Sequence, residues 1–371
     1  MEVALVHDFF CNLGGSDAVV QALHQLFPEA PVYTLLVYDR NRQAELVQGM
    51  KLRTSFIQRL PLAGRIHQPF LPLFPLATES FDLRGYDVVI SSSHSCAKGV
   101  ITPPETLHIC YCHTPMRYAW DMYFEYTWRM GRLTRLVTAL VMHYIRQWDV
   151  SSSARVDHFI ANSRFVARRI WKYYRRKATV IHPPVDTAYF TPGDEREDYY
   201  LVVSRLTGYK RIDLAVAAFN RLGYPLRVIG NGPESRRLQS MARPNITFLG
   251  HQPRRVVREH LARCRALVFP GVEDFGIVPV EAQAAGRPVI AYASGGALET
   301  VVNGVTGVFF QEQNPAALCA AVGAFEQTTF DREIIRNHAL KFDATRFFQE
   351  MRAFVATKVG EEYTDEHVGT A

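Results

Sequence analysis

Short apolar runs without polar alternation recur along the chain, and they limit the folds open to it. Examples are LVVS (201–204), RVIG (227–230) and ALVFP (266–270). Strands of this composition are buried on both faces, as in parallel sheets covered by helices. Longer segments with helical spacing, such as Arg211–Leu222 and Pro253–Cys264, separate them. Alternating strands and helices predict an α/β fold with parallel sheets.

Two such series occur, and they predict two domains. The first series consists of the predicted strands Val3–Phe10, Val32–Leu36, Asp87–Ser93, Leu107–Thr114, His158–Asn162 and Ala178–His182. The second consists of Tyr199–Ser204, Leu226–Gly230, Ile246–Leu249, Ala266–Pro270, Pro288–Ala293 and Gly307–Phe310. A chain of 371 residues also fits two domains. We therefore predict an α/β fold with two Rossmann-like, doubly wound parallel-sheet domains that face a cleft.

The boundary between the domains is expected within Pro183–Asp198, which holds three prolines, a glycine and a run of charges. We predict a first domain over residues 1–185 and a second over residues 186–345. A helical pattern over about Arg332–Thr357 follows. Residues 346–371 are expected to form a C-terminal helix that crosses back to the first domain, and a flexible tail.

Positive charge is concentrated in one part of the chain. The net charge is +6, and residues 51–190 hold 19 lysines and arginines against 9 aspartates and glutamates. Such an excess attracts phosphate-rich partners, so nucleic acid, an anionic membrane and a diphosphate-linked substrate all fit, as does ordinary solvated charge. Because no known RNA- or DNA-binding module accompanies the charge, we predict no nucleic-acid partner.

The N-terminal sequence MEVALVHDFF lacks a basic region, and no stretch of 18 residues is uniformly apolar. We expect a cytoplasmic protein, with contact to the inner face of the plasma membrane at most peripheral. Two segments leave this contact open. The proline-rich segment Leu52–Phe81 fits an irregular insertion or a loop that meets a lipid-linked acceptor, and Arg129–Arg146 fits a core helix or a helix resting on anionic lipid.

The segment Glu273–Glu281, EDFGIVPVE, carries the strongest chemical signal. It follows a predicted strand and opens a helical run. Gly276 allows close approach of the backbone to a ligand, and the N–H groups of Ile277 and Val278 at the helix start favour an anion such as a diphosphate. The two carboxylates suit sugar hydroxyls, because each has two acceptor oxygens.

A second signal lies in VSRLTGYKR, after the strand that opens the second series. Arg205 and Lys210 stand on either side of a glycine turn, and two cations at a strand end suit a doubly charged diphosphate. No Asp-x-Asp pair follows an apolar run, so we predict no metal site and no cofactor; the counter-charge comes from Arg205, Lys210 and the helix start.

Weaker signals lie in the first series. Gly14 and Gly15 follow the first strand and fit either a phosphate-binding turn or a plain tight turn. His113 ends the run CYCHTP at the carboxyl edge of the predicted sheet, where it could bind a sugar hydroxyl. We do not expect a zinc site there, because strand alternation puts Cys110 and Cys112 on the face opposite His113.

Together these residues resemble retaining glycosyltransferase family 4, of the GT-B fold, with WbaZ-like bacterial mannosyltransferases the nearest likeness. The stretches that carry the resemblance are LGGSD, SSSHSCAKGV, HICYCHTPMRYAWDMYFEY, ANSRFVARRI, VIHPPVD, VSRLTGYKR, VIGNGPE, ITFLGHQP and EDFGIVPVE, which together span nearly all of residues 1–345. We see no departure from the family pattern at its key positions.

The resemblance implies a role for each matching residue. It places Glu273 on the transferred sugar, Glu281 on the ribose, Arg205 and Lys210 on the diphosphate, and His113 on the donor sugar. The same resemblance puts Gly14 and Gly15 under the phosphates, and it assigns Phe275, Gly276, Ile277 and Val278 to donor binding. The segment Leu249–Pro253, with Gly250, would frame the nucleobase.

We therefore expect a retaining hexosyltransferase. The donor implied by the resemblance is GDP-mannose, and the acceptor is a lipid-linked saccharide of surface polysaccharide or lipopolysaccharide synthesis. Two alternatives stay open: a UDP-sugar donor, and a subunit that binds a sugar nucleotide without catalysis.

Overall fold

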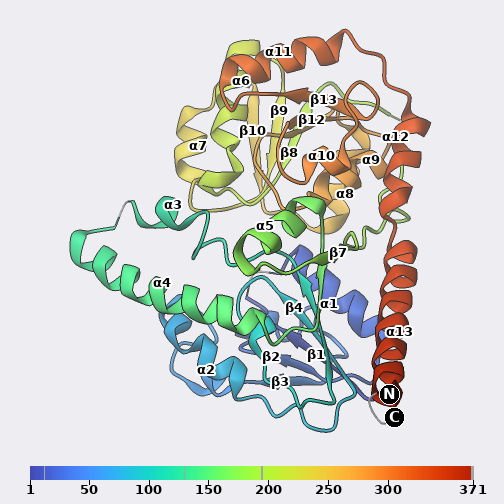
Figure 1. Ribbon diagram of the computed structural model, residues 1–371. Coiled ribbons are helices and arrows are strands. Elements are labelled where there is room, and N and C mark those ends of the chain that lie inside the picture. Colours follow the sequence, from blue (N-terminus) through green and yellow to red (C-terminus); the bar gives the residue numbers. More distant parts are fainter. Residues whose placement is uncertain (12, 129, 194, 369–371) are drawn as a thin grey trace. The chain divides into compact units, whose positions relative to one another are not determined.

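The computed structural model describes residues 1–11, 13–128, 130–193 and 195–368, with side chains up to residue 361. The chain divides into two compact units (Figure 1). Unit 1 contains Met1–His182 and Phe348–Ala371, and unit 2 contains Pro183–Phe347. Each unit is built on one parallel sheet, and both together have the GT-B fold that the sequence predicts.

Unit 1 has a seven-stranded sheet in the order β3-β2-β1-β4-β5-β6-β7, with every pair parallel. The strands are β1 (Val3–His7), β2 (Val32–Thr34), β3 (Leu52–Thr54), β4 (Val88–Ser93), β5 (Leu107–Cys112), β6 (His158–Ala161) and β7 (Ala178–Val180). The central strands β1, β4 and β5 are buried along their whole length, as their unbroken apolar runs predict.

Helices and short 3-10 turns connect the strands of unit 1. They are α1 (Gly15–Leu26), η1 (Asp39–Asn41), η2 (Phe56–Arg59), η3 (Gln68–Leu73), α2 (Phe74–Glu79), η4 (Ala97–Gly99), α3 (Tyr123–Thr127), α4 (Arg132–Ser153) and α5 (Arg164–Tyr174). In the described part of the chain, none of the helices combines the length and the apolar run needed to span a bilayer.

The segment Leu52–Phe81 contains one strand that the sequence does not predict. β3 pairs in parallel with β2 at the sheet edge, and its three residues are half-buried or exposed. Such a short strand with a polar edge has no apolar run to reveal it. The rest of the segment forms η2, η3 and α2, and it buries Ile57 and Phe74 in an apolar cluster with residues of α4 while Leu62 and Leu76 stay exposed.

Unit 2 has a six-stranded parallel sheet in the order β10-β9-β8-β11-β12-β13. The strands are β8 (Tyr200–Val203), β9 (Leu226–Ile229), β10 (Ile246–Gly250), β11 (Leu267–Phe269), β12 (Val289–Tyr292) and β13 (Gly307–Phe310). Its helices are η5 (Gly208–Lys210), α6 (Ile212–Leu222), α7 (Ser235–Met241), α8 (Arg254–Arg263), α9 (Ile277–Ala284), α10 (Ala297–Thr300), α11 (Pro315–Glu326) and α12 (Arg332–Ala339). Two apolar clusters cover the opposite faces of this sheet.

The C-terminal helical pattern is interrupted rather than continuous. α12 ends at Ala339, η6 (Leu340–Phe342) follows, and α13 (Ala344–Val368) begins after Asp343, whose carboxylate accepts a hydrogen bond from the Thr345 amide at 2.8 Å. From Phe348 on, the chain belongs to unit 1. The predicted flexible tail falls mostly on residues whose side chains or placement lie outside the described part of the chain.

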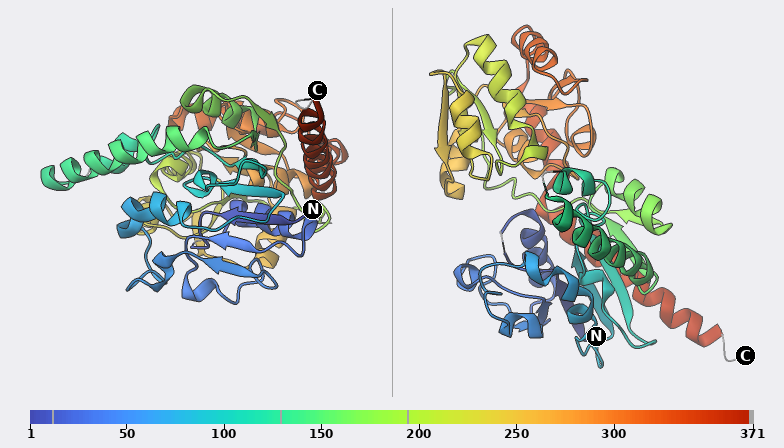
Figure 2. Two further views of the ribbon diagram at one scale, coloured as in Figure 1. Left: turned by 60° about the horizontal axis from the view of Figure 1, so that its bottom comes forward. Right: turned by 90° about the vertical axis from the view of Figure 1, so that its left-hand side faces the viewer.

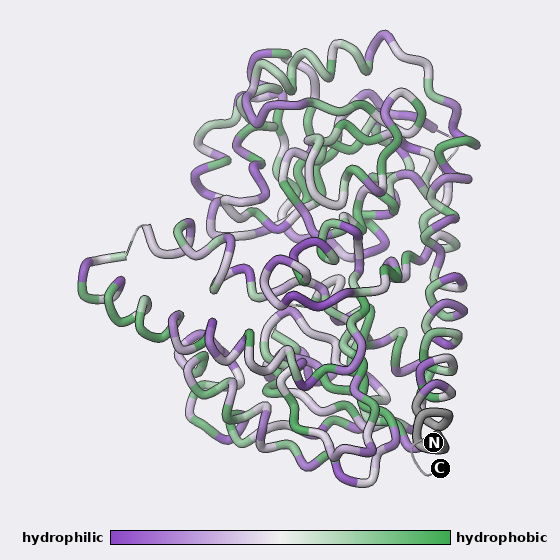
Figure 3. The backbone as a smooth tube through the Cα atoms, in the orientation of Figure 1, coloured by the Kyte–Doolittle hydropathy of each residue, from purple (hydrophilic) through white to green (hydrophobic). Residues whose placement is uncertain are grey.

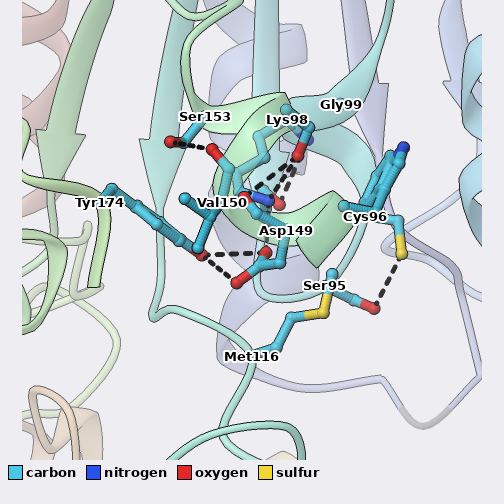
Figure 4. A network of polar contacts seen from close by, with 12 residues as sticks. Ser95, Cys96, Lys98, Gly99, Met116, Asp149, Val150, Ser153 and Tyr174 are labelled. Carbon is cyan, nitrogen blue, oxygen red and sulfur yellow. Dashed lines mark hydrogen bonds and ion pairs between the residues drawn. The ribbon is translucent and has the colours of Figure 1, made fainter. Parts of the chain in front are cut away.

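A buried ion pair fixes α4 and α5 to the sheet of unit 1 (Figure 4). Lys98 Nζ lies 2.5 Å from Asp149 Oδ1, and both side chains are buried. Asp149 also accepts hydrogen bonds from Tyr174 Oη at 2.9 Å and from Trp120 Nε1 at 2.7 Å. Burial acts to lower the pKa of Lys98, but the Asp149 carboxylate outweighs it and raises the pKa. Both charges are therefore retained inside the protein.

Replacement of Lys98 by methionine should lower the free energy of unfolding by about 3–5 kcal/mol, because the Asp149 charge is then buried without its partner. The double variant Lys98→Met/Asp149→Asn should regain part of this loss. Urea unfolding followed by circular dichroism measures both. The exposed Lys172→Ala on α5 serves as control, with an expected change within about 0.5 kcal/mol. Equal losses in the single and the double variant would contradict the ion pair's role.

Candidate functional site

The strand order of unit 2 creates a crevice at the carboxyl edge of its sheet. The chain runs from β8 outward through β9 to β10 and then returns to β11 on the other side of β8. The connections that follow β8 and β11 therefore leave in opposite directions. Ligands of open α/β sheets bind at such a switch point, outside the carboxyl ends of the strands.

Arg205 and Lys210 lie in the connection that follows β8. The short helix η5 ends at Lys210, and Arg211 then adopts a left-handed conformation with φ 54°. The Arg211 guanidinium bonds Asp213 at 3.2 Å and Gln313 at 3.4 Å, which stabilises this uncommon backbone. Arg205 is exposed, and its guanidinium has no hydrogen bond or ion pair with any described residue.

Glu273 lies in the connection that follows β11, and its carboxylate forms an ion pair with Lys210. The two side chains are 16% and 19% exposed. Two residues distant in the sequence are thus brought together at the crevice. Because neither side chain is fully buried, a ligand can still reach both.

The loop after Glu273 prepares the start of α9. Gly276 has φ 92°, a value that favours glycine, and no side chain caps the helix that begins at Ile277. The N–H groups of Ile277 and Val278 therefore stand at an uncapped, electropositive helix end. The Phe275 side chain is 3% exposed and packs on Phe342, so it anchors the loop in the core.

Glu281 lies in the second turn of α9. Its carboxylate has no hydrogen bond or ion pair with any described residue. Burial raises the pKa of Glu281 to about 7, with Arg254 acting to lower it and Asp186 to raise it. A half-buried carboxyl group without a partner among the described residues is a candidate acceptor for hydroxyl groups of a ligand.

Close backbone approaches at glycines position both charged loops. A Cβ added to Gly271 would lie 2.8 Å from the Lys210 carbonyl oxygen, and a Cβ on Gly230 would overlap the carbonyl oxygen of Ser204. The Gly295 position would place a Cβ against the Glu273 carbonyl oxygen, and the Gly296 amide donates to that same oxygen at 2.8 Å. The sequence reading missed these positioning residues, although Gly295–Gly296 and the GNG of VIGNGPE are visible in the sequence.

The space enclosed beneath the pair is small. A cavity of about 10 Å³ lies against Ser204, Lys210, Gly271 and Glu273, which is room for about one water molecule. A larger ligand must therefore lie on the open side of the crevice. Gly250 ends β10 with φ 69°, and its carbonyl oxygen accepts a hydrogen bond from the Gly230 amide at 2.7 Å.

The remaining predicted residues belong to unit 1. His113 follows β5, its Nε2 lies 2.8 Å from Ser92 Oγ, and its Nδ1 has no partner among the described residues. Burial lowers the pKa of His113 well below its usual value, so the ring is neutral. The predicted phosphate turn is partly occupied, because the Gly14 amide donates to Asp17 Oδ2 at 2.8 Å; Gly15 opens α1.

Asp8 is a further buried carboxylate that the sequence reading did not select. It follows β1 and accepts hydrogen bonds from the amides of residues 94–97 at 2.6 to 2.9 Å, and His94 Nδ1 lies 3.0 Å from it. Burial acts to raise the pKa of Asp8, but the charge and hydrogen bonds of His94 and the charge of His7 outweigh it and lower the pKa. In the sequence, the only feature that indicates a special role for Asp8 is its position directly after a buried strand.

The raised pKa of Glu281 predicts a pH dependence of stability. Between the ordinary pKa of a glutamate, 4.5, and about 7, the folded state holds a proton that the unfolded state releases. The stability of the wild type should therefore fall as pH rises through this range, and Glu281→Gln should remove that part of the slope. Melting temperatures of both proteins at pH 5 and pH 8 test this; parallel changes would contradict the raised pKa.

Comparison with known proteins places this geometry in a family. Residues 13–189 match the profile described as "Glycosyltransferase Family 4", and residues 190–342 match "Glycosyl transferases group 1". A D-inositol 3-phosphate glycosyltransferase of Mycolicibacterium gilvum is 31% identical over 50% of this chain and 48% of its own length. A glycogen synthase of Mycobacterium tuberculosis is 32% identical over 53% and 50%. The chain thus spans about half the length of these curated relatives.

Solved structures match the whole chain. The structure described as Anabaena Alr3699/HepE in complex with UDP and glucose has a TM-score of 0.70 at 16% identity, covering 96% of this chain and 99% of that one. WaaG, a glycosyltransferase involved in lipopolysaccharide biosynthesis, has a TM-score of 0.68 at 16% identity, covering 94% and 98%. With two adjoining profiles over residues 13–342 and the matching fold, the chain belongs to glycosyltransferase family 4 and has the GT-B fold.

Proposed function

We propose that the protein is a retaining glycosyltransferase that transfers a hexose from a nucleotide-sugar donor without a metal ion. The ion pair of Lys210 with Glu273 at the switch point of unit 2 is the observation that carries the proposal. It offers a cation for a diphosphate and a carboxylate for sugar hydroxyls side by side. Family membership supports the same assignment.

In this proposal the diphosphate is bound by Arg205, Lys210 and the amides of Ile277 and Val278. Without donor, Glu273 balances the charge of Lys210. A bound diphosphate takes over the lysine and leaves the Glu273 oxygens for the transferred sugar. Glu281 accepts from the two ribose hydroxyls, which its unpartnered carboxyl group supports.

The reaction breaks the bond between the anomeric carbon and the phosphate oxygen. Negative charge develops on the leaving diphosphate, where cations and helix amides stabilise it most in the transition state. The acceptor hydroxyl attacks the anomeric carbon from the same face of the sugar ring from which the diphosphate leaves. The leaving phosphate oxygen takes the proton of that hydroxyl. Neutral His113 has a ring nitrogen to spare for a donor-sugar hydroxyl, and Gly15 and Gly14 contribute backbone near the phosphates.

Mannose from GDP-mannose is our first candidate donor, because the sequence resembles WbaZ-like bacterial mannosyltransferases most nearly. A UDP-sugar is the second, supported by the complex of the structural neighbour with UDP and glucose. A lipid-linked saccharide is the proposed acceptor, in keeping with the neighbour involved in lipopolysaccharide biosynthesis.

Unit 1 carries a surface suited to contact with the membrane that would hold a lipid-linked acceptor. The first half of α4 projects beyond the sheet, together with α3 (Figures 1 and 2). This half of α4 is mostly hydrophobic (Figure 3). The first buried residue of α4 is Met142. Exposed apolar side chains of this hairpin are Phe124, Tyr126, Trp128, Leu133, Leu136, Val137, Leu140 and Tyr144. We call these eight residues the hairpin patch.

The hairpin patch fits an anionic bilayer surface better than a protein partner or the core. Leu133, Leu136 and Leu140 recur at helical spacing on one stripe, and Leu133 is 75% exposed. The exposed Arg132 and Arg135 flank this stripe, as in helices that lie at an anionic lipid interface. Arg129, where the predicted basic helix begins, lies outside the described residues.

Transferase activity is tested by release of nucleotide from GDP-mannose and from UDP-glucose with the purified protein. Lys210→Ala and Glu273→Ala should each lower kcat by about 100-fold to 1,000-fold, because each removes a group that stabilises the transition state. Arg236→Ala, an exposed arginine on α7, is the matched control and should keep full activity. Normal turnover by both variants, or no turnover by the wild type on any nucleotide sugar, would favour a non-catalytic binding subunit.

Membrane contact is tested by sedimentation with vesicles of equal parts phosphatidylglycerol and phosphatidylcholine. Leu136→Glu/Leu140→Glu should weaken binding by about tenfold or more, because two apolar side chains no longer enter the interface. The control Ile334→Glu changes an exposed apolar residue of α12 in unit 2 and should bind like the wild type. If the wild type instead forms a dimer that the double variant abolishes, the patch is an interface between copies.

A further inference from the structure

A second hollow in unit 2 lies at the opposite edge of the sheet from the candidate donor site. Its volume is about 270 Å³. Arg265 and Pro288 line it, just ahead of β11 and β12, so it opens at the amino ends of the strands. The end of α11, the loop Thr328–Phe330 and the first turn of α12 complete its wall. Lys210 and Glu273, by contrast, follow the carboxyl ends.

The lining of this hollow is strongly cationic. It holds four arginines, Arg196, Arg265, Arg287 and Arg332, against one carboxylate, Glu326. Glu326 is already engaged, because it accepts hydrogen bonds from Tyr200 Oη and from Arg265. The further carboxylate Asp198 pairs with Arg265 at 2.6 Å but lies outside the lining and is exposed. An excess of positive charge therefore remains inside.

Some side-chain N–H groups of these arginines have no hydrogen-bond acceptor among the described residues. Arg287 is 7% exposed and donates to the Ala262 carbonyl oxygen, and Arg332 Nη2 donates to that of Gly193. The Nε atoms of Arg265 and Arg332 are buried and lack any hydrogen-bond partner in the described part of the chain. The exposed Arg196 has no side-chain partner there either. A purely structural cluster would be expected to satisfy its buried donors.

The positive charges around the hollow also act on one another. Burial lowers the pKa of Arg287; Cys264 opposes this, and the positive charges of Arg332 and Arg196 lower the pKa further. An anion bound among such like charges would reduce their repulsion. Guanidinium groups match phosphate oxygens in geometry as well as in charge.

We propose that this arginine-lined hollow is a second anion site, which binds a small phosphate-bearing metabolite. Its volume lies just below the range of about 300–1,000 Å³ typical of pockets for drug-sized ligands, so a phosphate ester or pyrophosphate fits and a whole nucleotide sugar does not. The hydroxyl group of Thr329 at its rim adds a donor for a phosphate oxygen, whereas the Thr328 hydroxyl already donates to the Ala324 carbonyl oxygen at 2.8 Å. The site is independent of the proposed transfer reaction.

Calorimetric titration with pyrophosphate tests the proposal. The background is Arg205→Ala/Lys210→Ala, because the candidate donor site could also bind pyrophosphate. We expect one pyrophosphate per chain in this background. Adding Arg196→Glu should weaken binding at least tenfold, because it reverses a charge at the hollow. Arg236→Glu, an equal charge reversal on α7, should change binding by less than twofold.

Absence of binding to the Arg205→Ala/Lys210→Ala protein would overturn the second site. So would equal weakening by Arg196→Glu and Arg236→Glu, which would indicate general charge attraction. Arg196 is exposed and unpartnered among the described residues, so unchanged melting curves should show that its variant folds. Failure of the transferase assay leaves this result unaffected, since no donor or acceptor is used.

Discussion

The parallel order of β8 and β11 is the constraint on which the candidate site depends. All strands of unit 2 point the same way, so the connections that follow them begin at one edge of the sheet. At the switch point these connections diverge and leave room for a ligand. Lys210 and Glu273, distant in sequence, meet there. Their partial exposure matters as much as their contact. In a fully buried pair, Lys210 could not exchange Glu273 for the diphosphate of a nucleotide sugar.

Backbone contacts set the position of that pair. Gly271 lies against Lys210 and Gly295 against Glu273, so each charged side chain stands on a loop that another strand's connection supports. A side chain at either glycine would push one loop away while leaving both charges in the sequence. The chemistry of the site is therefore encoded by the charged residues, and its geometry by glycines that bear no chemistry.

This division explains how far the sequence could be read. All twelve apolar runs became strands, because burial on both faces leaves a direct composition signal. β3 was missed because three half-exposed edge residues leave none. The close approaches at Gly230 and Gly271 arise from tertiary contacts, which no local pattern records. The apolar spacing of α4 was legible, but spacing alone cannot tell a stripe that packs on a core from one that stays exposed.

Two carboxylates, one in each unit, show what separates structural from chemical roles. Asp8 follows β1 next to β4, at the switch point of the unit 1 sheet, and four backbone amides saturate its oxygens. Its charge is fully used in holding the loop after β4, so it has little to offer a ligand. Glu281 is half-buried, no described residue donates to it, and burial raises its pKa to about 7. A sequence shows only that both residues are acidic. The number of hydrogen-bond donors that the fold directs at each carboxylate decides which one keeps unpaired acceptor oxygens.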